Sequence, residues 1–155
     1  KIANVALDNS LCGFECVFTK KSDVWSFFKF SDIVLDHYYF SVADASVFSH
    51  GIRIEILERF TFGYFQELIQ KSFVGEGLVL HLYPENADYE EIDNYEDFQK
   101  SKCEMIILLY DFYYLEIYCK NQTWIQKLMH TAINTPGAVV EEKYEETDTR
   151  TTMYV

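Results

Sequence analysis

The sequence has few positive charges, few prolines and no long apolar run, and each shortage excludes a class of protein. Its 13 lysines and arginines stand against 25 aspartates and glutamates, so the net charge is −12. This balance disfavours direct contact with nucleic acid or with an anionic membrane surface, because both are negatively charged themselves. Only two prolines in 155 residues, together with a hydrophobic content of 49%, indicate a folded chain and not a disordered one.

The apolar runs are too short for a membrane protein. The longest, residues 105–110, falls far below the roughly 20 residues that span a bilayer. The first residues lack the apolar stretch and cleavage site of a signal peptide, so we expect a cytoplasmic protein. The cysteines lie in apolar stretches without metal-ligand spacing, which predicts buried, reduced thiols. They are Cys12, Cys16, Cys103 and Cys119. We expect no metal and no cofactor.

No catalytic signature is present in the sequence. A nucleophile elbow, a phosphate-binding loop and a dinucleotide fingerprint are all missing, and no histidine has a second ligand at metal-binding spacing. His81 falls on an expected strand, on the face opposite three leucines, which favours a structural histidine over a catalytic one. We therefore lean against an enzyme. A pocket between sheet and helices that uses His81, Asp111 and Tyr113 stays open as an alternative.

The second half of the chain has clear secondary-structure signals. Alternating or continuous apolar residues predict strands at 78–83, 105–110, 113–119 and 139–144. Asn94 and Asn121 are expected to cap helices, the first running to Lys100 and the second carrying a broad apolar stripe. The predicted order is strand, helix, strand, strand, helix, strand.

The first half echoes this order less clearly. Extended segments are predicted at 12–19, 38–42 and 51–57. Ser22 or Asp23 is expected to cap one helix and Thr61 another. The fold class is therefore α+β, a mostly antiparallel sheet with helices packed on one face. We expect a single domain, residues 1–155, and a two-lobed organisation into 1–75 and 76–155 is the alternative.

Negative charge is concentrated in the second half of the chain. Residues 1–75 carry nine acidic and seven basic side chains, whereas residues 76–155 carry 16 acidic and six basic ones. Segment 85–97 holds seven carboxylates and no lysine or arginine. Its plain interpretation is a solvated loop that leads into a helix with an acidic first turn. Its functional interpretation is an anionic surface whose tyrosines anchor a basic partner.

The candidate partner-binding residues all come from this segment. They are Asp88, Tyr89, Glu90, Glu91, Asp93, Tyr95, Glu96 and Asp97. A second acidic run, 141–148, would either extend the same surface or form an edge strand guarded by charge. Tyr114 and Tyr118 flank Glu116 on one face of an expected strand. That face is either the second covered side of the sheet or an exposed patch.

Several short motifs resemble a small bacillus-type family known only as a domain of unknown function. They are Tyr83 with Pro84, EIDNYEDF at 91–98, SKCE at 101–104, Tyr110 with Asp111, IYCK at 117–120 and DTR at 148–150. GFE at 13–15 and VWSFF at 24–28 match the opening strand and helix of that family, so the resemblance spans nearly the whole chain. It implies a cytoplasmic bacterial protein without an assigned activity, and it supplies no catalytic residues.

These observations favour a non-enzymatic protein-binding module with an acidic, tyrosine-rich face. Its most concrete form is an inhibitor or immunity-type protein that neutralises a basic partner. A small-ligand-binding protein or enzyme is one alternative, and a structural or homo-oligomeric subunit is another.

Overall fold

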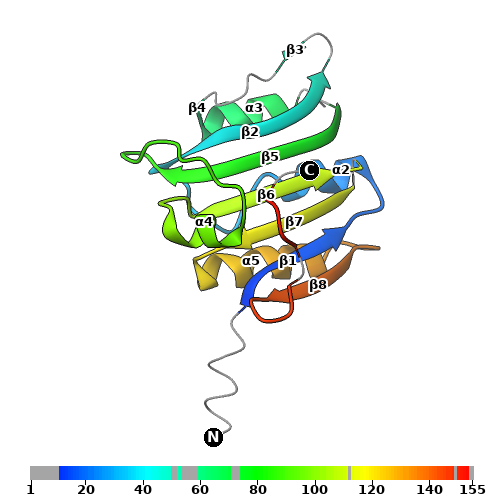
Figure 1. Cartoon of the computed structure of the whole chain (residues 1–155). Helices are drawn as coiled ribbons and strands as arrows, with labels where there is room; N and C mark the ends of the chain where they lie inside the picture. The colour runs from blue at the N-terminus through cyan, green and yellow to red at the C-terminus, as the bar shows by residue number, and fades with distance from the viewer. Residues whose placement is uncertain are drawn as a thin grey trace, which may run out of the picture.

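Strands from both halves of the chain lie in a single antiparallel sheet (Figure 1). The computed structural model describes residues 11–49, 52–53, 59–70, 74–111, 113–148 and 150–153. The described part of the chain contains eight strands, of which seven lie in the order β3-β2-β5-β6-β7-β1-β8 and the eighth, β4, pairs with β2 off this path. The strands are β1 (Leu11–Val17), β2 (Tyr38–Ser49), β3 (Ile52–Arg53), β4 (Arg59–Thr61), β5 (Val74–Pro84), β6 (Met105–Tyr110), β7 (Tyr114–Cys119) and β8 (Val139–Tyr144).

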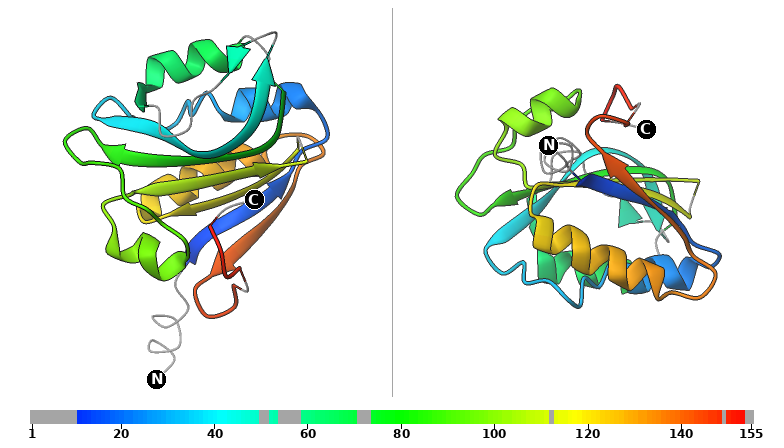
Figure 2. Two further views of the ribbon diagram at one scale, coloured as in Figure 1. Left: turned by 45° about the horizontal axis from the view of Figure 1, so that its top comes forward. Right: turned by 90° about the horizontal axis from the view of Figure 1, so that it is seen from below.

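Helices cover the two faces of the sheet unequally. On what we call the first face lie α2 (Lys21–Phe27), α3 (Phe62–Gln70) and α5 (Gln122–Ile133). The second face carries the short helix α4 (Tyr95–Lys100), the loop 85–94 before it, and the C-terminal segment, residues 145–148 and 150–153 (Figure 2). The α+β class is thus confirmed, with α4 added on the face opposite the other helices.

The order predicted for the second half is confirmed as β5, α4, β6, β7, α5 and β8. Asn94 accepts a hydrogen bond from the Asp97 amide at 2.8 Å, and Asn121 accepts one from the Trp124 amide at 3.1 Å. These side chains satisfy amide groups that the first turn of a helix leaves without partners. Both predicted caps are therefore present.

The first half is confirmed in part. Thr61 accepts a hydrogen bond from the Tyr64 amide at the start of α3, as predicted. The expected cap of α2 was wrong, because the helix begins one residue after Lys20 and has no side-chain capping bond. Asp23 instead lies in the first turn, where the helix dipole favours a carboxylate. Of the expected strand 51–57, residues 52–53 form β3 and the remainder lies outside the described residues.

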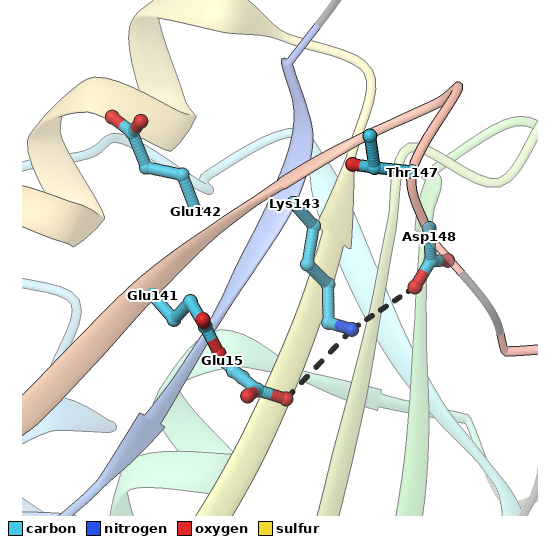
Figure 3. A pocket seen from close by; sticks show the side chains of 6 residues that line it. All are labelled: Glu15, Glu141, Glu142, Lys143, Thr147 and Asp148. Carbon is cyan, nitrogen blue, oxygen red and sulfur yellow. Dashed lines mark hydrogen bonds and ion pairs between the residues drawn. The ribbon is translucent and has the colours of Figure 1, made fainter.

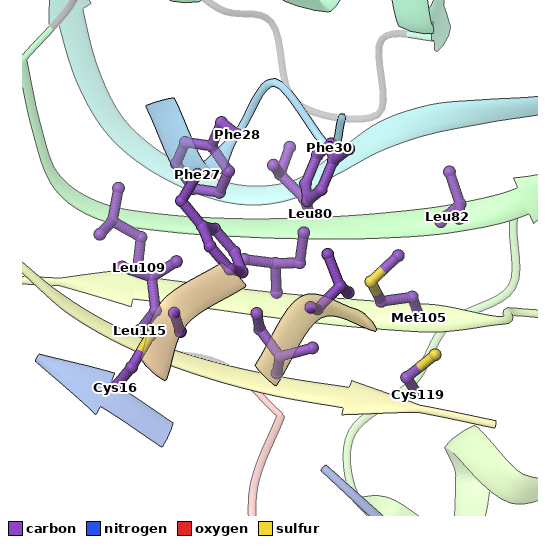
Figure 4. Packing of buried hydrophobic residues seen from close by; sticks show 14 of the residues in the cluster. Cys16, Phe27, Phe28, Phe30, Leu80, Leu82, Met105, Leu109, Leu115 and Cys119 are labelled. Carbon is purple, nitrogen blue, oxygen red and sulfur yellow. The ribbon is translucent and has the colours of Figure 1, made fainter. Parts of the chain in front are cut away.

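Buried hydrophobic side chains fill the space between the first face and its helices (Figure 4), and an aromatic cluster lies among them. Phe28 and Phe30 lie edge to face with ring centroids 5.9 Å apart, and Phe30 stacks on Phe40 of β2 at the same separation. Phe65 of α3 approaches Phe40 to 4.8 Å. Such ring pairs contribute about 1 kcal/mol each beyond the apolar area that they bury. This cluster therefore ties α2 and α3 to one end of the sheet.

The four cysteines are free and buried, as predicted. Burial raises the pKa of the Cys16 and Cys119 thiols to about 12, so both remain protonated at neutral pH. A protonated thiol is a poor nucleophile and a poor metal ligand. These cysteines serve as small apolar residues of the core.

The tyrosine-rich face of β7 is the second covered side of the sheet. Tyr118 is fully buried and Glu116 is 3% exposed, beneath the C-terminal segment. This settles the alternative that the sequence left open, because an exposed patch would leave both side chains in water.

Candidate functional site

The loop 85–94 is fastened to the second face by tyrosine hydroxyls. The Tyr83 hydroxyl donates to the Glu90 carbonyl at 3.0 Å and accepts from the Glu90 amide at 3.1 Å. The Tyr39 hydroxyl donates to the Ala87 carbonyl at 2.8 Å. Backbone groups that a loop would otherwise leave to water are thereby paired with the sheet. The acidic residues of the loop consequently project from a fixed backbone.

The structure divides the eight predicted binding residues into two sets. Four are exposed carboxylates, namely Asp88, Glu91, Asp93 and Glu96. The other four are half-buried, namely Tyr89, Glu90, Tyr95 and Asp97. Only the first set presents its charge to solvent in the way that a contact surface requires.

Glu90 and Asp97 have structural partners within the chain. A carboxylate oxygen of Glu90 accepts the Lys102 amide at 2.7 Å, and Asp97 accepts the Asp93 amide at 3.1 Å. Asn94 caps the start of α4 by accepting the Asp97 amide, and Asp97 accepts the amide of the residue before that cap. Removing either acid would disturb the loop backbone as well as its charge.

The two tyrosines are also engaged within the fold. The Tyr89 ring stacks on His81 with centroids 5.5 Å apart and an interplanar angle of 10°. The Tyr95 hydroxyl donates to Glu145 at 2.7 Å, and the Gln99 amide donates to the same oxygen at 2.7 Å. Burial, followed by this hydrogen bond, raises the pKa of Tyr95, so its hydroxyl stays protonated as a donor. Each ring keeps only part of its surface for a partner.

These contacts bring the two acidic runs of the sequence together. Glu145 belongs to the turn after β8, yet it meets Tyr95 and Gln99 of α4. The Met153 amide also donates to the Asp93 carbonyl at 2.9 Å, which joins the C-terminal segment to the loop. We use the name acidic face for six exposed carboxylates, four from the loop and α4 and two from the turn after β8. It consists of Asp88, Glu91, Asp93, Glu96, Glu145 and Glu146.

Beneath the C-terminal segment lies a network of buried charges that the sequence did not predict. The Arg150 guanidinium donates to both carboxylate oxygens of Glu116, with Nε at 3.1 and 3.0 Å. The Tyr110 hydroxyl donates to Glu116 at 2.6 Å, and the Lys143 ammonium lies 3.0 Å from it. Burial alone would raise the pKa of Glu116, but these donors lower it to about 2. Glu116 is therefore an anion at neutral pH, and it holds Arg150 on the sheet.

The same network continues to Asp148. Lys143 reaches Asp148 at 3.1 Å, and the Tyr118 hydroxyl donates to Asp148 at 2.7 Å. In the sequence, the signal that pointed to this network was the alternation of Tyr114, Glu116 and Tyr118 along β7. That alternation did not identify Arg150 or Lys143 as partners, because both are distant in sequence.

A pocket of about 350 Å³ opens beside this network (Figure 3). It is lined by Glu15, Glu141, Glu142, Lys143, Thr147 and Asp148. Glu15 lies directly opposite Glu141 on β8 and opposite Glu116 on β7. Burial and a hydrogen bond with Glu141 raise the pKa of Glu15, because two carboxyl groups in contact are more stable when they share a proton. The pocket is therefore lined by four carboxyl groups and one ammonium group, that of Lys143.

His81 has the structural role that the sequence favoured. It is 1% exposed, and its Nδ1 lies 3.1 Å from the Tyr83 hydroxyl. When that hydroxyl donates its single proton to the Glu90 carbonyl, the His81 tautomer with hydrogen on Nδ1 donates to the hydroxyl. Burial lowers the pKa of His81 to about 4, which keeps the ring neutral.

The alternative catalytic set does not assemble. His81 pairs with Ile106 at one end of β6, whereas Asp111 and Tyr113 follow the opposite end of that strand. Asp111 has a φ of 53°, which fits a residue that forms a tight turn between β6 and β7. Among the described residues, no group of three or more histidine, cysteine or acidic side chains is arranged to hold a metal ion. In the same part of the chain, no helix is long and apolar enough to cross a membrane.

The fold and this site define a small α+β protein with an acidic outer surface above a sheet face that contains buried charges. A family model for proteins of unknown function, DUF2691, matches residues 77–154, which is half of the chain. The chain therefore belongs to the DUF2691 family, as the motifs of its second half indicated. The first-half motifs at 13–15 and 24–28 lie outside the matched residues.

A curated relative shares part of this sequence. The uncharacterised protein YncE of Bacillus subtilis (strain 168) is 33% identical over 90 residues. That match covers 58% of this chain and 59% of the relative, so the chain spans about three fifths of the relative's length. No solved structure matches the chain.

Proposed function

We propose that this protein is a protein-binding module whose acidic face docks on a basic protein. The observation that carries the proposal is the convergence of two acidic runs, some 50 residues apart in sequence, at the contact of Glu145 with Tyr95 and Gln99. Two of the nearest cations, Lys143 and Arg150, are already engaged with Glu116 and Asp148. Of the acidic face, Glu96 pairs with Lys100 at 3.5 Å, and the other five carboxylates form no ion pair with a described lysine or arginine.

The physics of such a surface favours fast, salt-sensitive association. A cluster of like charges steers an oppositely charged partner and raises the association rate by about tenfold or more at low salt. An enzyme that acts on nucleic acid has a complementary basic groove. Inhibition of such an enzyme is therefore the concrete form of this proposal. The half-buried rings of Tyr89 and Tyr95 supply apolar contact area within the same surface.

The test compares two variants with the same net charge. The face variant carries Asp88→Asn, Glu91→Gln, Asp93→Asn and Glu96→Gln, and it spares Glu90 and Asp97 because these hold backbone amides. The control variant carries Asp23→Asn, Asp32→Asn, Glu67→Gln and Asp111→Asn, none of which belongs to the acidic face. Both remove four negative charges. Only the location differs.

Each variant and the original protein would be used to capture partners from host extract at about 0.05 M and 0.5 M salt. We expect the original protein and the control to retain a basic protein at the lower salt and to release it at the higher. The face variant should associate with that protein about tenfold more slowly in stopped-flow measurements. Equal association by the face and control variants would contradict the proposal.

A further inference from the structure

Strand β8 forms an open edge of the sheet. It pairs with β1 through residues 139–144, and it ends the strand order (Figure 1). No other described strand pairs with its outer side. The strand contains no proline that would block pairing, and Val139 at its start is 67% exposed. An edge strand of this kind offers a row of backbone N–H and C=O groups to any extended segment that lies beside it.

A row of carboxylates crosses the sheet and ends at this edge. Glu116 of β7, Glu15 of β1 and Glu141 of β8 lie directly opposite one another in register. Like charges at such positions destabilise a sheet. Arg150 and Lys143 compensate Glu116, and Lys143 also lies 3.8 Å from Glu15. Within the described residues, no lysine or arginine forms an ion pair with Glu141, so the outer end of the row lacks a cation.

The pocket beside this row lies where a neighbouring strand would place a side chain. Glu15, Glu141, Thr147 and Asp148 line it on the second face (Figure 3). In an added strand, the residue opposite Glu141 would direct its side chain to this same face, because paired residues share a face of the sheet. A lysine or arginine there would reach the Glu141–Glu15 pair.

We propose that an extended, lysine- or arginine-bearing segment of the basic partner adds to the sheet beside β8, with one cationic side chain against Glu141 and Glu15. This inference rests on the proposed function and names its binding mode. Main-chain hydrogen bonds would provide sequence-independent affinity, and the carboxylate row would select for a basic residue at one position. The occupant is a peptide segment of another protein.

The test uses two peptides of about ten residues with equal charge. The first alternates lysine with threonine, which suits an extended strand, and the second replaces each threonine with proline, which removes the backbone N–H donor at every second residue. We expect the alternating peptide to bind more tightly at about 0.15 M salt and to slow hydrogen exchange of the amides in 139–144. Glu141→Gln should weaken that peptide about fivefold. Glu67→Gln, a matched change on α3, should leave its affinity unchanged.

Four results would overturn strand addition. If both peptides bind equally, or if protection appears in 85–100 and not in 139–144, the edge is not the site. If Glu141→Gln binds the alternating peptide as well as the original protein does, the carboxylate row does not select the partner. If the face variant loses binding to the basic protein and any of these results is also obtained, strand addition is overturned but the acidic face is still supported as the docking surface. Failure of both peptides to bind would also overturn strand addition, whereas the acidic face is tested separately by the face and control variants.

Discussion

Arg150→Met removes the main cation that compensates Glu116. The carboxylate of Glu116 is 3% exposed, and Arg150 contacts both of its oxygens. The difference between an ordinary pKa of 4.5 and a pKa of about 2 corresponds to about 3 kcal/mol of preference for the charged form. Breaking a buried ion pair by removing one partner costs a similar amount, since the other charge stays buried. We therefore expect the variant to lose about 3 kcal/mol of unfolding free energy at pH 7.

Urea denaturation followed by tryptophan fluorescence measures this loss, because Trp25 and Trp124 are both half-buried. Lys100→Met is the matched control. Its ammonium pairs with Glu96 at 3.5 Å, and both side chains are 74% exposed. Exposed pairs of this kind contribute at most about 0.5 kcal/mol. The double variant Arg150→Met, Glu116→Gln should recover about 2 kcal/mol relative to Arg150→Met, because the buried group is then neutral.

The pH dependence supplies a second readout with a defined sign. The folded-state pKa of Glu116 lies below its unfolded value, so its contribution is present above about pH 4.5 and is lost as the pH falls towards 2. In Arg150→Met this loss should be largely gone, and the stability difference between the two proteins should shrink across that window. A variant that loses less than about 1 kcal/mol, or a difference that is constant from pH 7 to pH 3, would refute the reasoning.

Two further predictions concern the sheet itself. His81 has a folded-state pKa of about 4 against an ordinary 6.5, so the protein should lose about 3 kcal/mol as the pH falls from 6.5 to 4. His81→Phe should abolish that loss in urea titrations, and full stability of the original protein at pH 4 would contradict this. Gly13→Ala would place a Cβ 1.8 Å from the Ile117 carbonyl oxygen, so we expect a cost of about 3 kcal/mol or more. Gly63→Ala in α3 meets no atom closer than 4.0 Å and should be neutral or stabilising by thermal melting; equal melting temperatures for the two alanine variants would rule out the clash.

The second half of the fold was predictable because its signals are local. Asn94 and Asn121 cap their helices through amides three residues away, and the apolar run 105–110 forms a strand buried on both faces. In each case the determining contact is separated by only a few residues or depends on simple periodicity. The helix start near Lys20 was missed because α2 has no capping side chain and takes its position from buried Val24, Phe27 and Phe28.

The candidate site was predictable only as a region. Seven carboxylates without a cation between 85 and 97 indicated an acidic surface, and the loop and α4 do carry one. Glu90 is engaged by the Lys102 amide, 12 residues along the chain, whereas Asp97 accepts the Asp93 amide, only four residues before it. Local sequence does not distinguish Glu90 from Glu91, which has the same charge and the same kind of neighbours.

The buried network also determines where the acidic face lies. Arg150 and Asp148 anchor the C-terminal segment to Glu116, Lys143 and Tyr118 on the sheet. That segment in turn contacts the loop through the Met153 amide and the Asp93 carbonyl. The chain thus uses two of its few cations inside the fold to position carboxylates outside it. Because hydrophobic burial on the first face does not involve these residues, weakening the network should loosen the acidic face before it unfolds the sheet. Part of the negative charge of the second half is therefore compensated inside the fold. The network that compensates it also holds the exposed carboxylates of the acidic face in place.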